Sequence, residues 1–547
     1  MSATNYDGVI IAVTKDYLDT LDMTAPPDDD TIVSSVIEAV RDRVELENAV
    51  QSHKWQIPQR LHPVQVSMIM DKCLDVRYIL SAGQETGDEN GILAIYQTDG
   101  PKAGTYDARF SAIQREILRF YPRSSAKERE EVVAYLSTTC RRVECCTDPD
   151  LIAVNNGVFD YRTKTVMPFS PELVFLAKSA VDYNPNAANP IIHNPDDNTD
   201  WDVETWMSEL SDDPEVVALL WQIIGAVIRP HVRWNKSAWF YSETGNNGKG
   251  TLCALMRNLC GPGTSASIAL SDFSKDFRLE SLIGATSIIT DENDVGTFID
   301  KAANIKAVIT NDVIQINRKY KTIVNYRFYG FMVQCLNEMP RVKDRSESLY
   351  RRQLFVPFDK SFTGKERTYI KADYLNRSEV LEYVMFKVLN MNYYTLSEPE
   401  ACKRFLQDFK SYNDPVRQFV EEVLPDCVWD FIPTGFLFEL YTAWFKQNFP
   451  SGTQLGRTTF LRDIVSVISG SPSASAMWSC DSMRSPKRVG AAMQKPEPMT
   501  ITYGLNQWRN PSYRGADPNL IALPPALGLA RGLVRRTQTV TVDEDDE

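Results

Sequence analysis

Apolar and polar residues follow one another along the chain in patterns that predict both helices and strands. Apolar residues recur at helical spacing over residues 31–50 and 250–260. Short apolar runs typical of buried strands occupy residues 237–241, 285–294 and 330–340. Strands that alternate with helical segments indicate an α/β fold with a parallel sheet.

The flanking regions carry different patterns. Residues 91–106 predict two short strands around an Asp-Gly-Pro turn, and charged helical segments follow to about Arg142. Residues 151–170 are again strand-like, with Asn156-Gly157 as the turn signal. Residues 184–200 are rich in Asn, Pro and Asp and predict a loop, and residues 203–228 predict a pair of helices.

A chain of 547 residues is too long for a single core, so we expect several domains. The central α/β domain is expected to be flanked by a mixed α+β domain before it and a small helical or winged-helix-like domain after it. The expected segments are an N-terminal extension (1–60), the α+β domain (61–200), the α/β domain with its helical lead-in (201–365), the helical domain (366–470), and a low-order basic region with an acidic tail (471–547).

Composition narrows the class of protein. Hydrophobic residues make up 43% and charged residues 24%, as in ordinary globular proteins. We find no apolar run of about 18 residues and no secretory signal, so we expect a cytoplasmic protein without a membrane partner. The net charge of −13 argues against a basic surface overall, but a local basic patch can still bind nucleic acid.

The ten cysteines are mostly isolated in apolar surroundings, which indicates reduced thiols rather than a disulfide framework. The cluster CRRVECC contains Cys140, Cys145 and Cys146. It has no second ligand pair at metal spacing and no nearby His, so we interpret it as ordinary cysteines rather than a zinc site.

A glycine-rich loop, TGNNGKGT, lies between the apolar run 237–241 and the helical pattern 250–260. Strand, glycine loop and helix in this order are typical of a phosphate-binding loop, because backbone N–H groups and the helix N-terminus face the anion. Lys249 is positioned to reach the outer phosphates. The nucleotide-binding residues that we expect are consecutive: Gly245, Asn246, Asn247, Gly248, Lys249, Gly250 and Thr251.

The loop departs from the usual G-x-x-x-x-G-K-[ST] pattern at two positions. Glu243 stands where the first glycine would be, and Gly250 replaces the Ser or Thr after Lys249. Thr251, one residue later, would have to serve a Mg²⁺ ion, directly or through water. The alternative interpretation is a glycine-rich turn without function.

Three further motifs extend the nucleotide hypothesis. IITDEND ends an apolar run with two acids, and we assign Asp291 to a metal ion and Glu292 to the attacking water. Asn337 is expected between the glycine-loop strand and the acidic strand, in contact with the γ-phosphate or the water. One of the adjacent Arg351 and Arg352 could reach a neighbouring subunit's nucleotide and stabilise transition-state charge. Each has a plainer interpretation, as an acidic turn, a turn cap and surface charges.

The segment DVIQINRKYKTIVNYRFYG predicts a hairpin with cations and an aromatic residue at its tip. Such a tip can grip phosphates and stack on a base, although a solvated hairpin is the plainer interpretation. The candidate DNA-binding residues at the tip are Arg318, Lys319, Tyr320 and Lys321.

The order of these elements resembles the superfamily 3 helicases, in particular the phage, plasmid and poxvirus type of primase-helicase. The resemblance rests on TGNNGKGT, IITDEND, IKAVITNDVIQINRKYK and CLNEMPRVKDRSESLYRRQLFVPF, and it extends over residues 60–450. It implies an AAA+ ATPase core, a hexameric ring, ATP hydrolysis with Mg²⁺ and movement along single-stranded DNA, usually 3′ to 5′. It gives Lys249 the role of phosphate lysine, Asn337 that of sensor, and Lys319 or Lys321 that of DNA-contacting lysine.

The upstream region is too short for the primase domain that many relatives carry, and we find no Asp-x-Asp and His constellation for polymerising nucleotides within it. We therefore expect a replicative helicase of a phage or mobile element, in a bacterial host cytoplasm. A separate primase or polymerase and origin duplex DNA are further expected partners. Two alternatives stay open: a replication initiator that ATP assembles at an origin without processive unwinding, and a P-loop small-molecule kinase.

Overall fold

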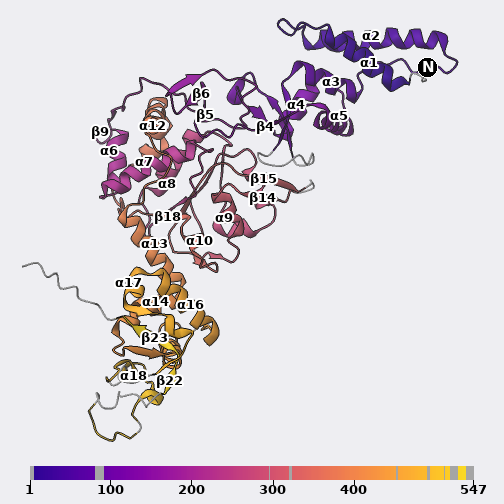
Figure 1. Cartoon of the computed structure of the whole chain (residues 1–547). Helices are drawn as coiled ribbons and strands as arrows, with labels where there is room; N and C mark the ends of the chain where they lie inside the picture. Colours follow the sequence, from indigo (N-terminus) through magenta and orange to yellow (C-terminus); the bar gives the residue numbers. More distant parts are fainter. Residues whose placement is uncertain are drawn as a thin grey trace, which may run out of the picture. The chain divides into compact units, whose positions relative to one another are not determined.

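The protein is described by a computed structural model that covers residues 5–80, 91–294, 296–318, 323–450, 454–488, 493, 495–510, 512–517 and 528–536. The chain forms two compact units, Met1–Leu406 and Gln407–Glu547 (Figure 1). Each unit has its own core: Trp206 and Leu219 lie in the main core of the first, and Trp429 and Leu440 lie in that of the second.

The first unit begins with helices and a small sheet. Helix α2 (Asp29–Val50) matches the helix predicted at residues 31–50, and Asp28 caps it by accepting a hydrogen bond from the Thr31 N–H. Its buried residues recur every four positions, which places them on one face. The other elements of this region are α1 (Tyr6–Asp19), α3 (Pro63–Cys73), α4 (Phe110–Phe120), α5 (Ala126–Thr139) and a sheet of order β3-β2-β1-β4, formed by Tyr106–Asp107, Ile92–Tyr96, Val76–Leu80 and Arg141–Glu144.

Antiparallel strands follow, as predicted for residues 151–170. Strands β5 (Leu151–Val154), β6 (Gly157–Asp160) and β7 (Thr165–Met167) form one sheet. Because Gly157 already pairs with Val154, the two-residue turn lies one residue earlier than the sequence indicates.

The loop predicted at residues 184–200 is only partly correct. It contains a hairpin of β8 (Ile192–Asn194) and β9 (Thr199–Trp201). Ile192 pairs with Trp201, and both side chains are buried in the main core of the first unit. The surrounding residues are mostly Asn, Pro and Asp, which are typical of loops. For this reason the sequence pattern does not predict that Ile192 and Trp201 belong to the core.

A five-stranded parallel sheet forms the centre of the first unit, as the sequence predicts. Its order is β11-β12-β16-β10-β18. The strands are almost entirely buried, because helices cover a parallel sheet on both faces. In chain order they are β10 (Ser237–Tyr241), β11 (Ser265–Ala266), β12 (Ser287–Thr290), β16 (Phe331–Leu336) and β18 (Gln353–Pro357).

Helix α8 (Lys249–Cys260) begins at the lysine of the glycine loop and packs against α7 (Pro214–Ile228) and α12 (Ser378–Asn390). The predicted pair of helices over 203–228 is confirmed as α6 (Val203–Glu209) and α7. The other elements of this region are α9 (Ala303–Ile309), α10 (Glu347–Tyr350), α11 (Thr368–Ala372), α13 (Glu400–Asn413), the strand pair β13 (Phe298–Ile299) and β17 (Arg341–Val342), and the hairpin β14 (Val313–Ile316) and β15 (Val324–Arg327).

The second unit combines helices with a three-stranded antiparallel sheet of order β19-β23-β20. The strands are Phe431–Pro433, Gly532–Arg535 and Trp478–Ser479. The helices are α14 (Pro415–Glu422), α15 (Thr434–Asn448), α16 (Arg457–Gly470), α17 (Pro472–Met477) and α18 (Met499–Thr502), and a second strand pair joins β21 (Lys487–Arg488) to β22 (Leu529–Ala530).

The low-order region expected at residues 471–547 is more regular than its composition indicates. Strand β23 pairs with both β19 and β20, and Trp478 and Leu533 lie in the core of the second unit. Widely spaced apolar residues supply this packing, so no local periodicity signals it. The acidic tail at 537–547 lies outside the described residues.

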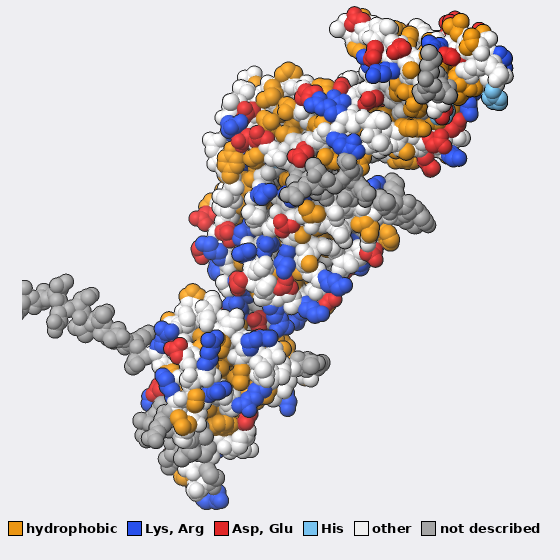
Figure 2. All heavy atoms as spheres, turned by 45° about the vertical axis from the view of Figure 1, so that its right-hand side comes forward, with side chains coloured by type: hydrophobic (Ala, Val, Ile, Leu, Met, Phe, Trp, Pro, Cys, Tyr) orange, Lys and Arg blue, Asp and Glu red, His pale blue; other side chains and the backbone are white. Residues whose placement is uncertain are grey.

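Acidic and basic side chains are interspersed over the visible face of each unit (Figure 2), which fits the moderate charge content of the sequence. None of the helices in the described part of the chain combines the length and the apolarity that crossing a membrane requires.

Candidate nucleotide site

Three of the predicted site residues lie at one edge of the parallel sheet. Lys249 follows β10, Asp291 follows β12 and Asn337 follows β16. Since the three strands are parallel, their carboxyl ends meet at the same edge, where α/β sheets usually bind ligands. Strand β16 lies between β10 and β12, so the strand position expected for Asn337 is confirmed.

The glycine loop has the backbone geometry of a tight turn into a helix. Gly248 caps α8 with a φ of 88°, and a Cβ atom at this position would lie 2.6 Å from Cδ2 of Leu210. Only glycine adopts this conformation without strain. Asn246 also has a positive φ, and its Nδ2 donates to Glu366 Oε1 at 3.0 Å. The loop therefore presents the N-terminus of α8 toward the sheet edge.

Lys249 turns inward rather than into solvent. Its Nζ donates to Asn337 Oδ1 at 2.8 Å, to the Leu336 carbonyl at 2.9 Å and to the Ser242 carbonyl at 3.2 Å. Burial lowers the pKa of Lys249 from its ordinary value. The structure thus brings the lysine and the asparagine of the sequence hypothesis into direct contact.

The acidic pair divides into a half-buried and an exposed member. Asp291 Oδ2 pairs with Arg257 Nη1 of α8 at 2.7 Å, while Glu292 is exposed. The next residue, Asn293, fastens the strand end, because its Nδ2 donates to Gln334 Oε1 and to the Cys335 carbonyl, each at 3.0 Å. The sequence hypothesis did not include Arg257 or Asn293.

A cavity opens beside the glycine loop. Gly248 and Thr251 border it on one side, and Lys371 of α11 approaches the same helix start, with Nζ 3.8 Å from where a Cβ on Gly250 would stand. The apolar side chains that line it come from α6 and from the segment after β18: Trp206, Leu210, Phe362 and Ile370. An apolar cavity beside a phosphate-binding loop can receive the flat ring of a nucleobase.

A second cavity lies away from this sheet edge. It is predominantly apolar, with Ile79, Val174 and Tyr326 among its lining residues. It contains none of the residues that the sequence hypothesis assigns to nucleotide chemistry, so we do not place that chemistry there.

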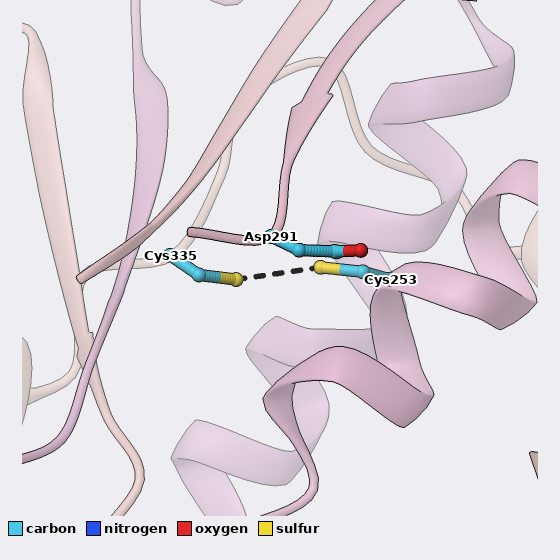
Figure 3. Close-up of side chains that lie close together, drawn as sticks. All are labelled: Cys253, Asp291 and Cys335. Atoms are coloured by element: carbon cyan, nitrogen blue, oxygen red, sulfur yellow. Dashed lines mark hydrogen bonds between the residues drawn. The ribbon is translucent and has the colours of Figure 1, made fainter. Parts of the chain in front are cut away.

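Two cysteines lie close to Asp291 (Figure 3). Cys253 of α8 and Cys335 of β16 are buried, with their Sγ atoms 3.4 Å apart. A carboxylate oxygen of Asp291 and the two sulfur atoms all lie within 4.8 Å of one another. The spacing could have indicated this pair, since Cys253 is one helical turn after Lys249 and Cys335 is two strand positions before Asn337.

The arginine pair lies at the opposite edge of the sheet. β10 and β18 are parallel, with Ser237 paired to Gln353, so Arg351 and Arg352 precede the amino end of β18 while the glycine loop follows the carboxyl end of β10. Five strand residues separate the two edges by roughly 16 Å. Arg351 is exposed, whereas Arg352 Nη1 donates to Ser348 Oγ at 2.7 Å. Both arginines therefore lie at the opposite sheet edge from Lys249 of the same chain.

The predicted hairpin exists as β14 and β15, which pair antiparallel from Val313–Arg327 to Ile316–Val324. Arg318 lies at its described end, near Glu280, with Nε and Oε1 3.5 Å apart. The other tip residues of the hypothesis, Lys319, Tyr320 and Lys321, lie outside the described residues.

A loop beside the hairpin presents an aromatic residue that the sequence hypothesis missed. Phe277 is 54% exposed and has a φ of 65°, which is unusual for a bulky residue. Lys275 and Arg278 flank it, and Asn317 of the hairpin donates to Asp276 of this loop at 2.9 Å. An exposed aromatic between cations is suited to stacking on a base near phosphates.

Three family models match successive segments: D5 N terminal like at residues 51–210, a family of unknown function (DUF5906) at residues 240–352, and Poxvirus D5 protein-like at residues 411–479. No curated protein matches the sequence.

Solved apo structures of the NrS-1 C-terminal region are similar to parts of the chain. One shares 12% identity at a TM-score of 0.37, covering 75% of this chain and 86% of that chain. Two others share 13% and 14% identity at TM-scores of 0.39 and 0.40, and they cover 74% and 78% of this chain and 94% and 96% of those chains.

The two D5 matches fall on either side of the parallel sheet and the glycine loop, in the order that the sequence motifs predict. Residues 51–210 and 411–479 are therefore similar to D5-type proteins, including the poxvirus D5 protein.

Proposed function

We propose that the protein is an ATP-dependent replicative DNA helicase that works as a ring, most simply a hexamer, on single-stranded DNA. The similarity of residues 51–210 and 411–479 to D5-type models supports a replication role of the helicase or primase type. The observation that carries the proposal is the meeting of Lys249, Asp291 and Asn337 at the carboxyl edge of one parallel sheet, beside a glycine loop that opens a helix.

The residues at this edge fit a magnesium-bound triphosphate. Helix α8 begins at Lys249, directly after the glycine loop, so its N-terminus can attract phosphate, and Lys249 supplies an ammonium group. Asp291 Oδ1 is buried and has no hydrogen-bond partner among the described residues. When bound, magnesium neutralises charge on the β- and γ-phosphate oxygens.

Each side chain then has one role. Asp291 and Thr251 would hold the metal, Glu292 would orient the attacking water, and Asn337 would contact the γ-phosphate. The cavity lined by Trp206, Leu210, Phe362 and Ile370 would receive the base. Lys371, near the helix start, would add a second cation to the phosphate site.

The position of the arginine pair supports a site completed by a neighbouring subunit. Arg351 is exposed at the sheet edge opposite the glycine loop of its own chain. An arginine placed there can reach a nucleotide only across a subunit boundary, as in a head-to-tail ring. The parallel strand order, with the glycine-loop strand between β16 and β18, supports the proposed AAA+ core.

The β14–β15 hairpin forms a separate sheet and leads in the chain to the amino end of β16, at the same edge of the parallel sheet as the arginine pair. With the Lys275–Arg278 loop beside it, it offers cations and an exposed aromatic for single-stranded DNA. Because β16 joins the hairpin to Asn337, a change at the nucleotide can be transmitted along one strand to the DNA.

ATP turnover tests the nucleotide site first. Lys249→Ala should lower DNA-stimulated ATP hydrolysis by at least about 100-fold, because the phosphate charge loses its buried cation. Lys446→Ala, on α15 of the second unit, is the matched control and should retain wild-type turnover. Equal turnover in the wild type and Lys249→Ala would remove the site from the proposal.

Strand separation on a forked duplex distinguishes the helicase from a replication initiator. A helicase displaces the strand while it consumes ATP. A protein that binds duplex tightly in an ATP-dependent manner but displaces nothing would instead be an initiator. A helicase and an initiator would both use the base cavity and both depend on Lys249. The strand-separation experiment therefore tests only whether ATP hydrolysis is coupled to unwinding.

A further inference from the structure

Cys253, Cys335 and Asp291 form the one group of three potential metal ligands found among the described residues. They come from α8, β12 and β16, the three elements that carry the candidate nucleotide residues (Figure 3). No sequence motif joins them, since they meet only through the fold.

The ligand set and its spacing suit a thiophilic divalent cation. In a tetrahedral zinc site with Zn–S bonds of about 2.3 Å, the sulfur atoms stand about 3.8 Å apart. Here they are 3.4 Å apart, and a carboxylate oxygen lies within 4.8 Å of both. Movements of a few tenths of an ångström at the sulfurs and a small rotation of the Asp291 carboxylate would bring three ligands around one ion.

The surroundings of Asp291 are those of a ligating carboxylate. Arg257 holds one oxygen, Oδ2, at 2.7 Å, and also donates to the Ile289 carbonyl at 2.9 Å. The other oxygen, Oδ1, is buried and lacks a hydrogen-bond partner within the part of the chain that the structure describes. A carboxylate fixed through one oxygen leaves the second available to a metal.

Charge is also balanced in such a site. Two thiolates and one carboxylate carry three negative charges, and a divalent cation together with Arg257 compensates them. A disulfide between the two cysteines would require the sulfurs to approach to about 2.05 Å and would leave Asp291 Oδ1 without a partner. The third ligand therefore favours a metal over a disulfide.

We propose that Cys253, Cys335 and Asp291 bind one zinc-class divalent cation directly behind the candidate nucleotide site. The ion clamps α8, β12 and β16 together and occupies Asp291. Binding of the ion is independent of the proposed function. Its effect on hydrolysis rests on that function, because Asp291 is also the proposed magnesium ligand.

Cobalt titration of the full-length, reduced protein tests the site. We expect one Co²⁺ per chain with thiolate-to-cobalt charge-transfer absorption, displaced by equimolar Zn²⁺. Cys253→Ser and Cys335→Ser should each abolish this absorption. Arg257→Gln should weaken cobalt binding about 10- to 100-fold through misplacement of Asp291.

Cys260→Ser is the matched control. Cys260 is a buried cysteine of the same helix, and its Sγ contacts Ser287 Oγ at 3.4 Å instead of this group. This variant should keep the full absorption. Thermal unfolding of every variant checks that it folds, and cadmium-113 NMR of the wild type counts sulfur ligands without any substitution.

Absence of thiolate absorption in the wild type, or equal loss in Cys260→Ser, would overturn the proposal. A cadmium-113 spectrum that does not indicate two sulfur ligands would also overturn the proposal. So would the loss of two free thiols without bound metal, because that result indicates a disulfide. Zinc-dependent loss of ATP turnover, reversed by a chelator, is measured separately. A protein that binds cobalt but hydrolyses no ATP would refute the proposed function and leave this site standing.

Discussion

Glu497 is a carboxyl group with no exposed surface in the core of the second unit. Its Oε2 accepts hydrogen bonds from the backbone N–H groups of Val428 at 2.7 Å and Trp429 at 2.9 Å, and Oε1 accepts one from Met499 at 3.3 Å. Burial raises its pKa above the ordinary glutamate value, and the backbone donors offset only part of this effect. One side chain thus accepts hydrogen bonds from three backbone N–H groups.

We expect this residue to make the stability of the second unit depend on pH. Between the ordinary glutamate pKa and the raised one, the folded carboxyl group holds a proton that the unfolded chain has released. The free energy of unfolding therefore falls as pH rises through this window and increases as pH falls through it. Hydrogen exchange at Val428 and Trp429 in the full chain, measured at several pH values, reports the change.

Glu497→Gln should remove this pH dependence, because the amide keeps an acceptor oxygen and carries no charge. Glu497→Ala should lower the free energy of unfolding by at least about 2 kcal/mol at every pH, because buried N–H groups lose their acceptor. An unchanged pH profile in Glu497→Gln would show that another group titrates there.

At the scale of elements, the parallel sheet separates two sets of residues. The nucleotide residues follow the carboxyl ends of β10, β12 and β16, whereas Arg351 and Arg352 precede the amino end of β18. The two arginines also differ from each other. Arg352 is half-buried, burial lowers its pKa, and it is tied to Ser348, while Arg351 is exposed.

Mixed subunits test whether Arg351 acts on a neighbouring chain. We expect Lys249→Ala and Arg351→Ala each to lack ATP turnover alone and an equal mixture to recover it at about one quarter of the interfaces, where an intact loop meets an intact arginine. ATP hydrolysis measured across mixing ratios gives the result. Arg352→Ala, whose side chain is tethered, is the comparison and should retain more turnover. No recovery at any ratio would contradict action across subunits.

The hydrophobic pattern and the motifs of the sequence predict most of the helices and strands around the site. They predict fewer of the contacts between the site residues. Helix α8, strand β10 and the position of β16 follow from local spacing and from the order of motifs. The β8–β9 hairpin and the order within residues 472–536 do not, because a few distant apolar residues supply their packing. The Arg257–Asp291 pair forms only when helix and strand assemble, so no local pattern encodes it. The spacing of the two cysteines from Lys249 and Asn337 indicates that they lie near the site, but their contact depends on the assembled sheet.

At the scale of the whole molecule, the largest core clusters of the two units share no residue among the described ones. Trp429 and Leu440 belong to one, and Leu219 belongs to the other. Because each core buries its own side chains, each unit can unfold as a cooperative block.

Core substitutions should therefore act on one unit at a time. Leu440→Ala should destabilise the second unit by about 3 kcal/mol and lower only its unfolding transition by several degrees. Leu219→Ala should lower only the transition of the first unit. Scanning calorimetry of the full chain resolves the two events, and a single transition that moves with both substitutions would show that the units unfold together.

The inward position of Lys249 has a thermodynamic consequence. All three of its N–H donors already have acceptors: two backbone carbonyls and Asn337 Oδ1. An anion that binds this ammonium group must replace one or more of these acceptors. Its measured affinity is therefore the difference between the new ionic interaction and the hydrogen bonds that are lost. The same exchange breaks the hydrogen bond from Lys249 Nζ to Asn337 Oδ1. Binding of an anion therefore changes the contacts of Asn337, at the end of β16, before any covalent bond of the anion is cleaved.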